Sequence, residues 1–289
     1  MTKARIDFSA PLVSTAWLNA HLETDNVRII DGTYFLPNIQ RNAAIEYEAE
    51  HIPGACFFDI DDIKDPQNNL PHMIPPAEIF SSRVRKMGIS DSDYVVVYDR
   101  LGVFSSPRIW WTFRLFGHEN IAILDGGLPK WLREKLPVTD QKYSPKDGHF
   151  TAHLNTKFLR TFDQIKANLD TNEELIIDGR PAGRFSGEVE EPRPGLACGH
   201  IPGSVNLMPT LFMNPKTGAL LSKPELHNVF VSAGIDPEGP MAMTCGSGVA
   251  AATLSFVRFL VTGKIAPVYD GSWTEWGSTE GAPVATSQS

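Results

Sequence analysis

A cysteine in a glycine-rich turn is the feature of this sequence most able to do chemistry. The turn, Cys245-Gly-Ser-Gly-Val, follows the short apolar run 241–244 and leads into a longer apolar segment. Gly246 and Gly248 allow backbone conformations in which consecutive N–H groups face one point. Together with the positive end of a following helix, they would stabilise Cys245 as a thiolate nucleophile, and we expect its sulfur to be reachable from solvent. The alternative is a small buried hydrophobe at a strand end.

Two arginines could bind an anionic substrate beside this cysteine. Arg184 and Arg193 lie in a segment rich in glycine and proline that follows the apolar run 174–178. Arginine binds planar carboxylate and carbonyl oxygens with paired donors. Arg180 is a weaker candidate for the same role. The alternative is that these arginines are solvated and paired with nearby glutamates, namely Glu188, Glu190 and Glu191.

The chain repeats itself in tandem. Four short motifs of the first half recur in the same order 145 to 149 residues later. Such a repeat indicates one domain duplicated, so we expect an N-terminal domain over 1–140, a linker over 141–155 and a catalytic C-terminal domain over 156–289. The repeated motifs are Ile-Ile-Asp-Gly (from Ile29 and Ile176), His-Ile-Pro-Gly (His51 and His200), Gly-Ile (Gly88 and Gly234) and Asp-Gly (Asp125 and Asp270).

Short apolar runs alternate with helical patterns in each copy. This order predicts an α/β fold in which each domain is a mainly parallel sheet with helices on both faces. Ligands bind such sheets outside the carboxyl ends of the strands, which is where Cys245 stands. Asp99 occupies the equivalent position of the first copy, so that domain should be catalytically inactive. The predicted strands are 27–31, 94–98, 121–124, 174–178, 241–244 and 268–269, and the predicted helices are 76–87, 107–116, 224–233 and 248–262.

The composition narrows the class of protein. Of 289 residues, 42% are hydrophobic and 21% are charged, which is typical of a globular chain. A net charge of −8 disfavours nucleic acid as a partner. Three cysteines without close spacing indicate a reducing compartment and neither a disulfide framework nor a metal site. With no leader, membrane-span or dinucleotide pattern, we expect a cytoplasmic protein without a membrane partner or a cofactor.

Motifs along most of the chain resemble a single family. The sequence is similar to the tandem-domain sulfurtransferases of the rhodanese superfamily, and within it to the group that acts on 3-mercaptopyruvate. One departure is Ala250, where that family usually has threonine. The motifs that carry the resemblance are His51-Ile-Pro-Gly-Ala, Pro107-Arg-Ile-Trp-Trp, Gly183-Arg-Phe, Glu191-Pro-Arg-Pro-Gly, Gly199-His-Ile-Pro-Gly, Cys245-Gly-Ser-Gly-Val and Tyr269-Asp-Gly-Ser-Trp-Thr-Glu-Trp.

The resemblance implies two-domain rhodanese-like architecture and sulfur transfer from 3-mercaptopyruvate through a Cys245 persulfide, with release of pyruvate. The acceptor would be a thiol, such as thioredoxin or glutathione, or cyanide. Arg184 and Arg193 would bind the substrate's carboxylate and carbonyl. The resemblance also implies a proton relay formed by Ser247, His72 and Asp61. The substrate-binding turn would be formed by Gly246, Gly248 and Val249.

Other functions stay open from the residues alone. Thiosulfate sulfurtransferases resemble this chain but carry basic side chains in the turn, where Gly246 and Ser247 stand here. Phosphatases of related fold need an arginine at the position of Ala251, so cleavage of phosphate esters is not expected. A persulfide-carrying or docking protein would use the same cysteine with little turnover of its own. A cysteine hydrolase is a weaker alternative, because histidine and aspartate partners exist in the chain.

Overall fold

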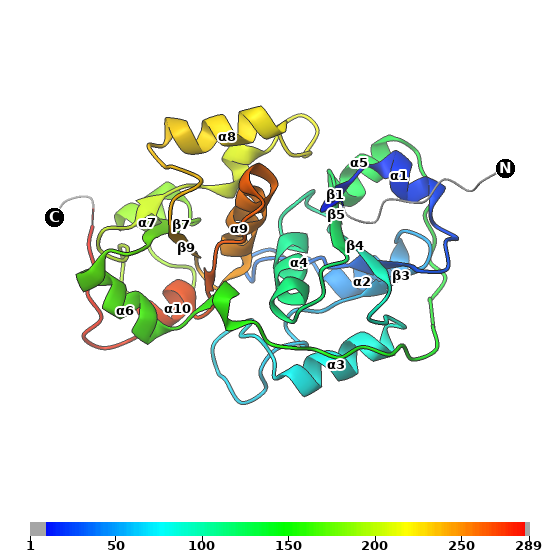
Figure 1. The fold of residues 1–289 in the computed structure, drawn as a ribbon, viewed down its shortest axis with the longest axis horizontal. Coiled ribbons are helices and arrows are strands. Elements are labelled where there is room, and N and C mark those ends of the chain that lie inside the picture. The colour runs from blue at the N-terminus through cyan, green and yellow to red at the C-terminus, as the bar shows by residue number, and fades with distance from the viewer. Residues whose placement is uncertain (1–9, 287–289) are drawn as a thin grey trace.

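The computed structural model describes residues 10–286 and contains two five-stranded sheets (Figure 1). The strand order is β1-β5-β4-β2-β3 in the first sheet and β6-β10-β9-β7-β8 in the second. Every neighbouring pair is parallel. The two orders correspond strand for strand, and the predicted α/β fold with parallel sheets is confirmed. The outer limits of the predicted domains, residues 1 and 289, lie outside the described residues.

The same alternation of strand and helix is found in each half. The first half runs β1 (Leu12–Val13), α1 (Thr15–Ala20), β2 (Val27–Asp31), α2 (Ala43–Ala49), β3 (Ala55–Phe57), α3 (Ala77–Lys86), β4 (Tyr94–Tyr98), α4 (Ser106–Leu115), β5 (Ile121–Leu124) and α5 (Gly127–Arg133). The second half runs β6 (Leu159–Arg160), α6 (Phe162–Thr171), β7 (Leu175–Asp178), α7 (Ala182–Ser186), β8 (Val205–Asn206), α8 (Lys223–Ser232), β9 (Met241–Thr244), α9 (Val249–Thr262), β10 (Val268–Tyr269) and α10 (Ser272–Trp276). Short 3-10 turns at Thr156–Phe158 and Pro209–Phe212 complete the second half.

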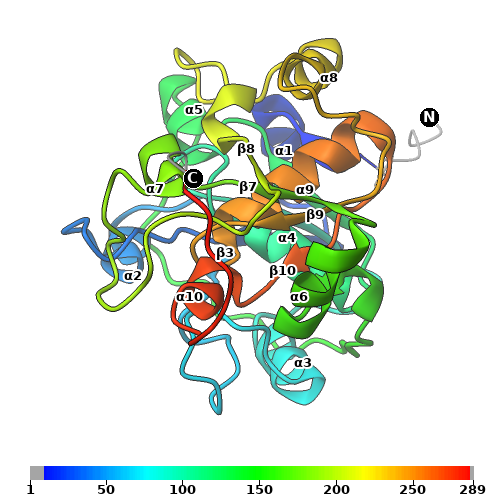
Figure 2. The same cartoon turned by 90° about the vertical axis from the view of Figure 1, so that its left-hand side faces the viewer.

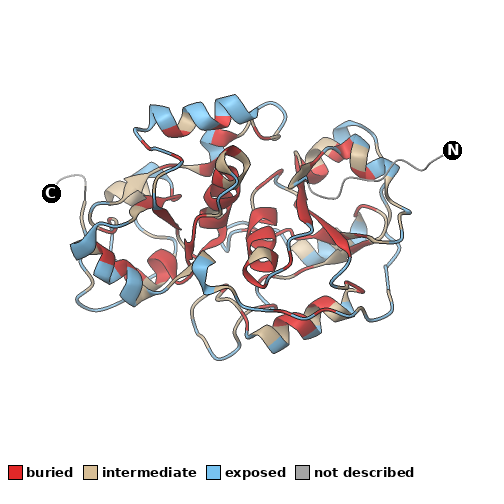
Figure 3. Ribbon diagram, in the orientation of Figure 1, coloured by how far each residue is buried: buried red, intermediate tan, exposed pale blue. Residues whose placement is uncertain are grey.

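Each sheet is covered on both faces, and the inner faces look toward each other. In β4, Val95 and Val97 belong to a core cluster that also contains residues of the second half, whereas Tyr94 and Val96 pack on the outer side with residues of α1 and α5. Helices α4 and α9 meet between the sheets and are buried there (Figures 1 and 3). Because one apolar core runs through both halves, side chains from either half can contribute to a shared site.

The predicted linker packs against the first half. Figure 1 shows this extended segment passing beside α3. The side chain of Phe150 is 1% exposed, and the N–H of Ala152 donates to Ser81 Oγ at 3.0 Å. Within residues 10–286, no helix is both long and apolar enough to span a membrane. Figure 2, which faces the second half, shows α6, α7 and α10 around its sheet.

Candidate active site

Cys245 stands directly after β9, at the carboxyl end of the second sheet's central strand. Gly248 caps the following helix with a left-handed φ of +78°, and Val249 is the first residue of α9. The backbone N–H groups of Gly246, Ser247 and Gly248 have no acceptor within residues 10–286. Three consecutive donors beside a helix N-terminus suit an anion.

The first half contains the same kind of turn with an anion already in it. Asp99 follows β4, the strand that corresponds to β9. Its Oδ1 accepts the N–H of Leu101 at 2.8 Å, and its Oδ2 accepts those of Phe104, Ser105 and Ser106 at 2.8, 3.0 and 2.9 Å. The Ser106 hydroxyl adds a bond of 2.7 Å. This turn therefore binds a negative charge, which supports a thiolate or persulfide anion at the matching position of the second half.

The Cys245 side chain is less accessible than the sequence suggested. The residue is only 3% exposed and belongs to the core cluster shared by both halves, so the expectation of a solvent-reachable sulfur was wrong. Helix α10 closes over the turn, because the N–H of Trp273 donates to the Cys245 carbonyl at 2.9 Å. Both the N–H and the hydroxyl of Thr274 donate to the Gly246 carbonyl, at 3.0 and 2.6 Å.

Ser247, His72 and Asp61 form a hydrogen-bonded chain across the two halves. His72 Nδ1 lies 3.0 Å from Ser247 Oγ, and His72 Nε2 lies 3.2 Å from Asp61 Oδ1. The His72 side chain is 1% exposed, whereas that of Asp61 is 54% exposed. The hydrogen bond from His72 lowers the pKa of Asp61 below its usual value. A carboxylate at one end keeps the imidazole oriented so that it can exchange a proton with Ser247.

Arg184 reaches the cysteine turn from α7. A Cβ placed on Gly246 would lie 3.3 Å from Arg184 Nη2, so the glycine leaves room for this guanidinium. Arg184 Nε and Nη2 both bond the carboxylate of Glu191, with Nε at 3.1 Å from Oε1. The Glu191 side chain is 2% exposed, and it also accepts from Arg180 Nη1 at 2.8 Å. Arg184 is thus held by one edge and retains donors for a ligand.

Arg193 lies with first-half residues near the same turn. Burial raises the pKa of Tyr34 to about 12; the Asp61 carboxylate adds to this rise, Arg193 opposes it, and a charged Cys245 adds to it again. Arg193 also helps to lower the pKa of Asp61. Tyr34 packs edge-on against His72, with ring centroids 4.8 Å apart. These electrostatic links join Arg193 to Tyr34, Asp61 and Cys245 in one region.

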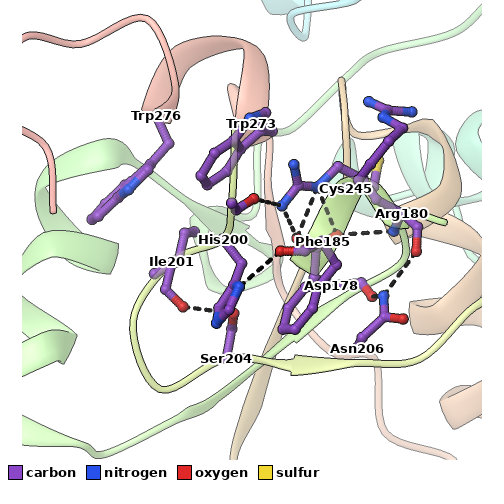
Figure 4. Close-up of polar contacts among 12 residues, drawn as sticks. Asp178, Arg180, Phe185, His200, Ile201, Ser204, Asn206, Cys245, Trp273 and Trp276 are labelled. Atoms are coloured by element: carbon purple, nitrogen blue, oxygen red, sulfur yellow. Dashed lines mark hydrogen bonds and ion pairs between the residues drawn. The ribbon is translucent and has the colours of Figure 1, made fainter. Parts of the chain in front are cut away.

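Arg180 and the two matched histidines have structural partners. Arg180, 1% exposed, pairs with Asp178 Oδ2 at 2.7 Å and lies over the Trp273 ring (Figure 4). His200 Nδ1 bonds the Phe185 carbonyl at 2.8 Å, and His51 Nδ1 bonds the Tyr47 carbonyl at 2.7 Å. The donors of Arg180 are therefore used by Asp178, Glu191 and the Gly199 carbonyl, which fits its place as the weaker candidate for substrate binding. The repeated histidines brace the same local segment in each half.

Comparison with known proteins decides the family. The family model described as the rhodanese-like domain matches twice, at residues 14–134 and 161–279. The chain belongs to the rhodanese family. This rhodanese chain is 40% identical over 271 residues to human 3-mercaptopyruvate sulfurtransferase, covering 92% of the chain and 91% of the relative. It is 39% identical over 272 residues to mouse thiosulfate sulfurtransferase, with 92% and 91% covered.

A solved rhodanese structure agrees. The crystal structure of SseA from Escherichia coli, a 3-mercaptopyruvate sulfotransferase, matches with a TM-score of 0.83 and 36% identity. The match covers 91% of this rhodanese chain and 98% of SseA.

Three residues that contact the candidate site are not among those predicted from the sequence. Tyr34 and Arg108 come from the first half, and Asp270 comes from the second. Glu191 is one of the glutamates named as possible partners of the arginines, and it pairs with Arg184 and Arg180. The available signal was position: Tyr34 follows β2 and Asp270 follows β10, each at the carboxyl end of a parallel strand.

Proposed function

We propose that this protein is a 3-mercaptopyruvate sulfurtransferase that carries sulfur as a persulfide on Cys245. The observation that carries the proposal is the meeting of three features at one turn. These are an anion-binding turn after β9, a Ser247–His72–Asp61 chain with contacts of 3.0 and 3.2 Å, and the guanidinium of Arg184 beside Gly246. A substrate with a thiol at one end and a carboxylate at the other fits this arrangement.

In the first half-reaction, the Cys245 thiolate attacks the substrate sulfur. An S–S bond forms, the substrate's C–S bond breaks, and its electron pair leaves as the enolate of pyruvate. The proton of the substrate thiol passes to the Ser247–His72 pair, which returns it to the enolate carbon. Arg184 and Arg193 hold the carboxylate and carbonyl oxygens, and Arg193 balances the charge that develops on the enolate. The turn residues Gly246, Gly248 and Val249 line the anionic sulfur.

In the second half-reaction, an acceptor attacks the outer sulfur of the persulfide. A thiolate acceptor, such as that of thioredoxin or glutathione, takes this sulfur as its own persulfide and returns Cys245 as a thiolate. Cyanide takes it as thiocyanate. The two steps share one enzyme form, so ping-pong kinetics are expected.

The first domain, proposed over residues 1–140, contributes His72 and Asp61 but no nucleophile, because Asp99 fills its own turn. The catalytic domain is proposed over 156–289, with 141–155 as the connection. A reducing compartment such as the cytoplasm suits a chain whose three cysteines are all unpaired within the described residues.

The test is intact mass spectrometry after incubation with 3-mercaptopyruvate, with pyruvate release followed in parallel. The wild-type chain is expected to gain the mass of one sulfur atom and to release pyruvate over many turnovers when an acceptor thiol is present. The Cys245→Ser variant should do neither. Multiple turnover by the Cys245→Ser variant would refute the assignment. A wild-type chain that gains sulfur but shows no multiple turnover would favour a persulfide carrier.

A thiosulfate sulfurtransferase is the second candidate, favoured by the mouse relative of nearly equal identity. Against it stands the absence of a cationic side chain at positions 246 and 247 of the turn, where a dianion would need one. Measuring kcat/KM for both donors with the same acceptor separates the two functions.

A further inference from the structure

We propose that Arg108 and Asp270 form a clamp between the two halves that positions His72 for the sulfur-transfer reaction. The inference rests on the function proposed above and adds two positioning residues to it. Neither residue belongs to the Ser247–His72–Asp61 chain. Both side chains are buried, each 3% exposed.

The clamp holds the backbone that follows the imidazole, at the His72 carbonyl and the Ile74 N–H. Arg108 projects from α4, and its Nη2 forms an ion pair with Asp270 Oδ1 at 2.7 Å. The same Nη2 donates a short hydrogen bond to the His72 carbonyl. The other carboxylate oxygen of Asp270 accepts the N–H of Ile74 at 2.8 Å. One buried ion pair therefore fixes residues 72 to 74 of the first half against the second half.

The backbone of His72 needs such a support. Its φ is +62°, in the left-handed region that a residue with a Cβ adopts only when its surroundings impose it. The ring itself has three contacts, with Ser247, Asp61 and Tyr34. Asp61 is half-exposed and gives weak restraint. The His72 carbonyl and the Ile74 N–H are held by buried charged groups, so they are the stronger restraint on where Nδ1 lies.

Arginine suits this position better than lysine does. Its planar group lies over the Trp111 ring at 4.7 Å while its Nη2 pairs with Asp270 and donates to the His72 carbonyl, and lysine has no planar group that could keep the contact with the ring. A Cβ added to Gly248 would lie 2.6 Å from Arg108 Nη1, so the guanidinium also abuts the cysteine turn. The clamp thus touches the two segments that must meet, the His72 loop and the turn after Cys245.

The experiment is a double-mutant cycle with Arg108→Lys and His72→Ala. Arg108→Lys is expected to displace the His72 imidazole and so to lower kcat by about tenfold to a hundredfold, because a misplacement of about 1 Å in a catalytic group can have an effect of this size. KM for 3-mercaptopyruvate should stay within about twofold, since the substrate arginines are untouched. In the His72→Ala background, Arg108→Lys should have almost no further effect on kcat, because it acts through the imidazole.

Two further variants guard the interpretation. Asp270→Asn keeps the shape of the carboxylate and an acceptor for Ile74 but removes the ion pair, so it should show the same loss of kcat and the same non-additivity. Arg258→Lys is the matched control: Arg258 is 5% exposed in α9 and bonds the carbonyls of Pro237 and Gly239 at 3.0 and 2.8 Å. It should lower the melting temperature and leave kcat unchanged.

The clamp is overturned if both clamp variants keep the wild-type kcat, or if their losses persist undiminished in the His72→Ala background. It is also overturned if His72→Ala alone retains full activity. A wild-type chain that releases no pyruvate would refute the proposed function itself and take the clamp with it. An active wild type with insensitive clamp variants would refute the clamp alone.

Discussion

Replacing Arg184 by lysine should weaken the use of an anionic substrate and leave the thiol intact. Glu191 takes the Nε–Nη2 edge of Arg184, so the remaining donors, those of Nη1 and the second N–H of Nη2 near Gly246, are the ones that can meet a substrate carboxylate. Lysine retains the positive charge but loses the paired donors. A hydrogen bond to a charged group contributes about 1.5–3 kcal/mol. Loss of one such bond corresponds to a fall in kcat/KM of about ten- to a hundredfold.

Two measurements test this reasoning. The first is kcat/KM for 3-mercaptopyruvate from pyruvate release. The second compares alkylation of Cys245 by iodoacetate and by iodoacetamide, which differ in having a carboxylate or an amide. The rate of alkylation by iodoacetate should be higher in the wild type than in the Arg184→Lys variant. The rate with iodoacetamide should be nearly the same in both.

A matched control is Arg160→Lys, because Arg160 forms a similar two-bond pair with Glu174, at 2.7 and 2.6 Å, on the edge strand β6. This variant should retain both the kinetics and the preference between reagents. If Arg184→Lys behaves as the control does, Arg184 is a structural residue and the carboxylate must be bound elsewhere.

Three other substitutions have definite expected outcomes. Gly248→Ala should lower both the melting temperature and kcat, because φ is +78° and the new Cβ would meet Arg108 Nη1 at 2.6 Å; a variant with wild-type values in both would contradict this. Asp99→Asn should lower the free energy of urea unfolding by about 1–2 kcal/mol, because the amide leaves at least one N–H of the turn without an acceptor. For Asp61→Asn, the stability of the variant is compared with that of the wild type as a function of pH. The hydrogen bond with His72 lowers the pKa of Asp61, so the carboxylate stabilises the fold fully above its unfolded pKa of about 4. This stabilisation is lost as the pH falls through the lower pKa of the folded state. The stability difference between wild type and Asp61→Asn should therefore shrink in acid, and a difference that persists there would argue against the pairing.

The central strands could be predicted from the sequence because their apolar runs are bounded by turn residues. The predicted limits of 27–31, 94–98, 121–124, 241–244 and 268–269 agree with β2, β4, β5, β9 and β10. The two-residue edge strands β1, β6 and β8 gave no such run. Their pairing is decided by the neighbouring strand and not by their own residues.

The site was predicted unevenly for a physical reason. The turn at Cys245 is local, so its residues show in a short stretch of sequence. The contact between His72 and Ser247 spans 175 positions, and only the family resemblance pointed to it. Buried charges such as Arg108 are stabilised by a partner on the other half, which leaves no periodic pattern along the chain. Resemblance supplied residues, but it could not supply their burial.

The depth of Cys245 has a consequence for how sulfur leaves the protein. At 3% exposure, the resting side chain is sheltered from bulky thiols in its surroundings. Persulfide formation lengthens the Cys245 side chain by one sulfur atom, and this terminal atom is the one that the sulfur acceptor must reach. The outer sulfur of the persulfide would then be the atom by which an acceptor distinguishes the sulfur-loaded protein from the unloaded one.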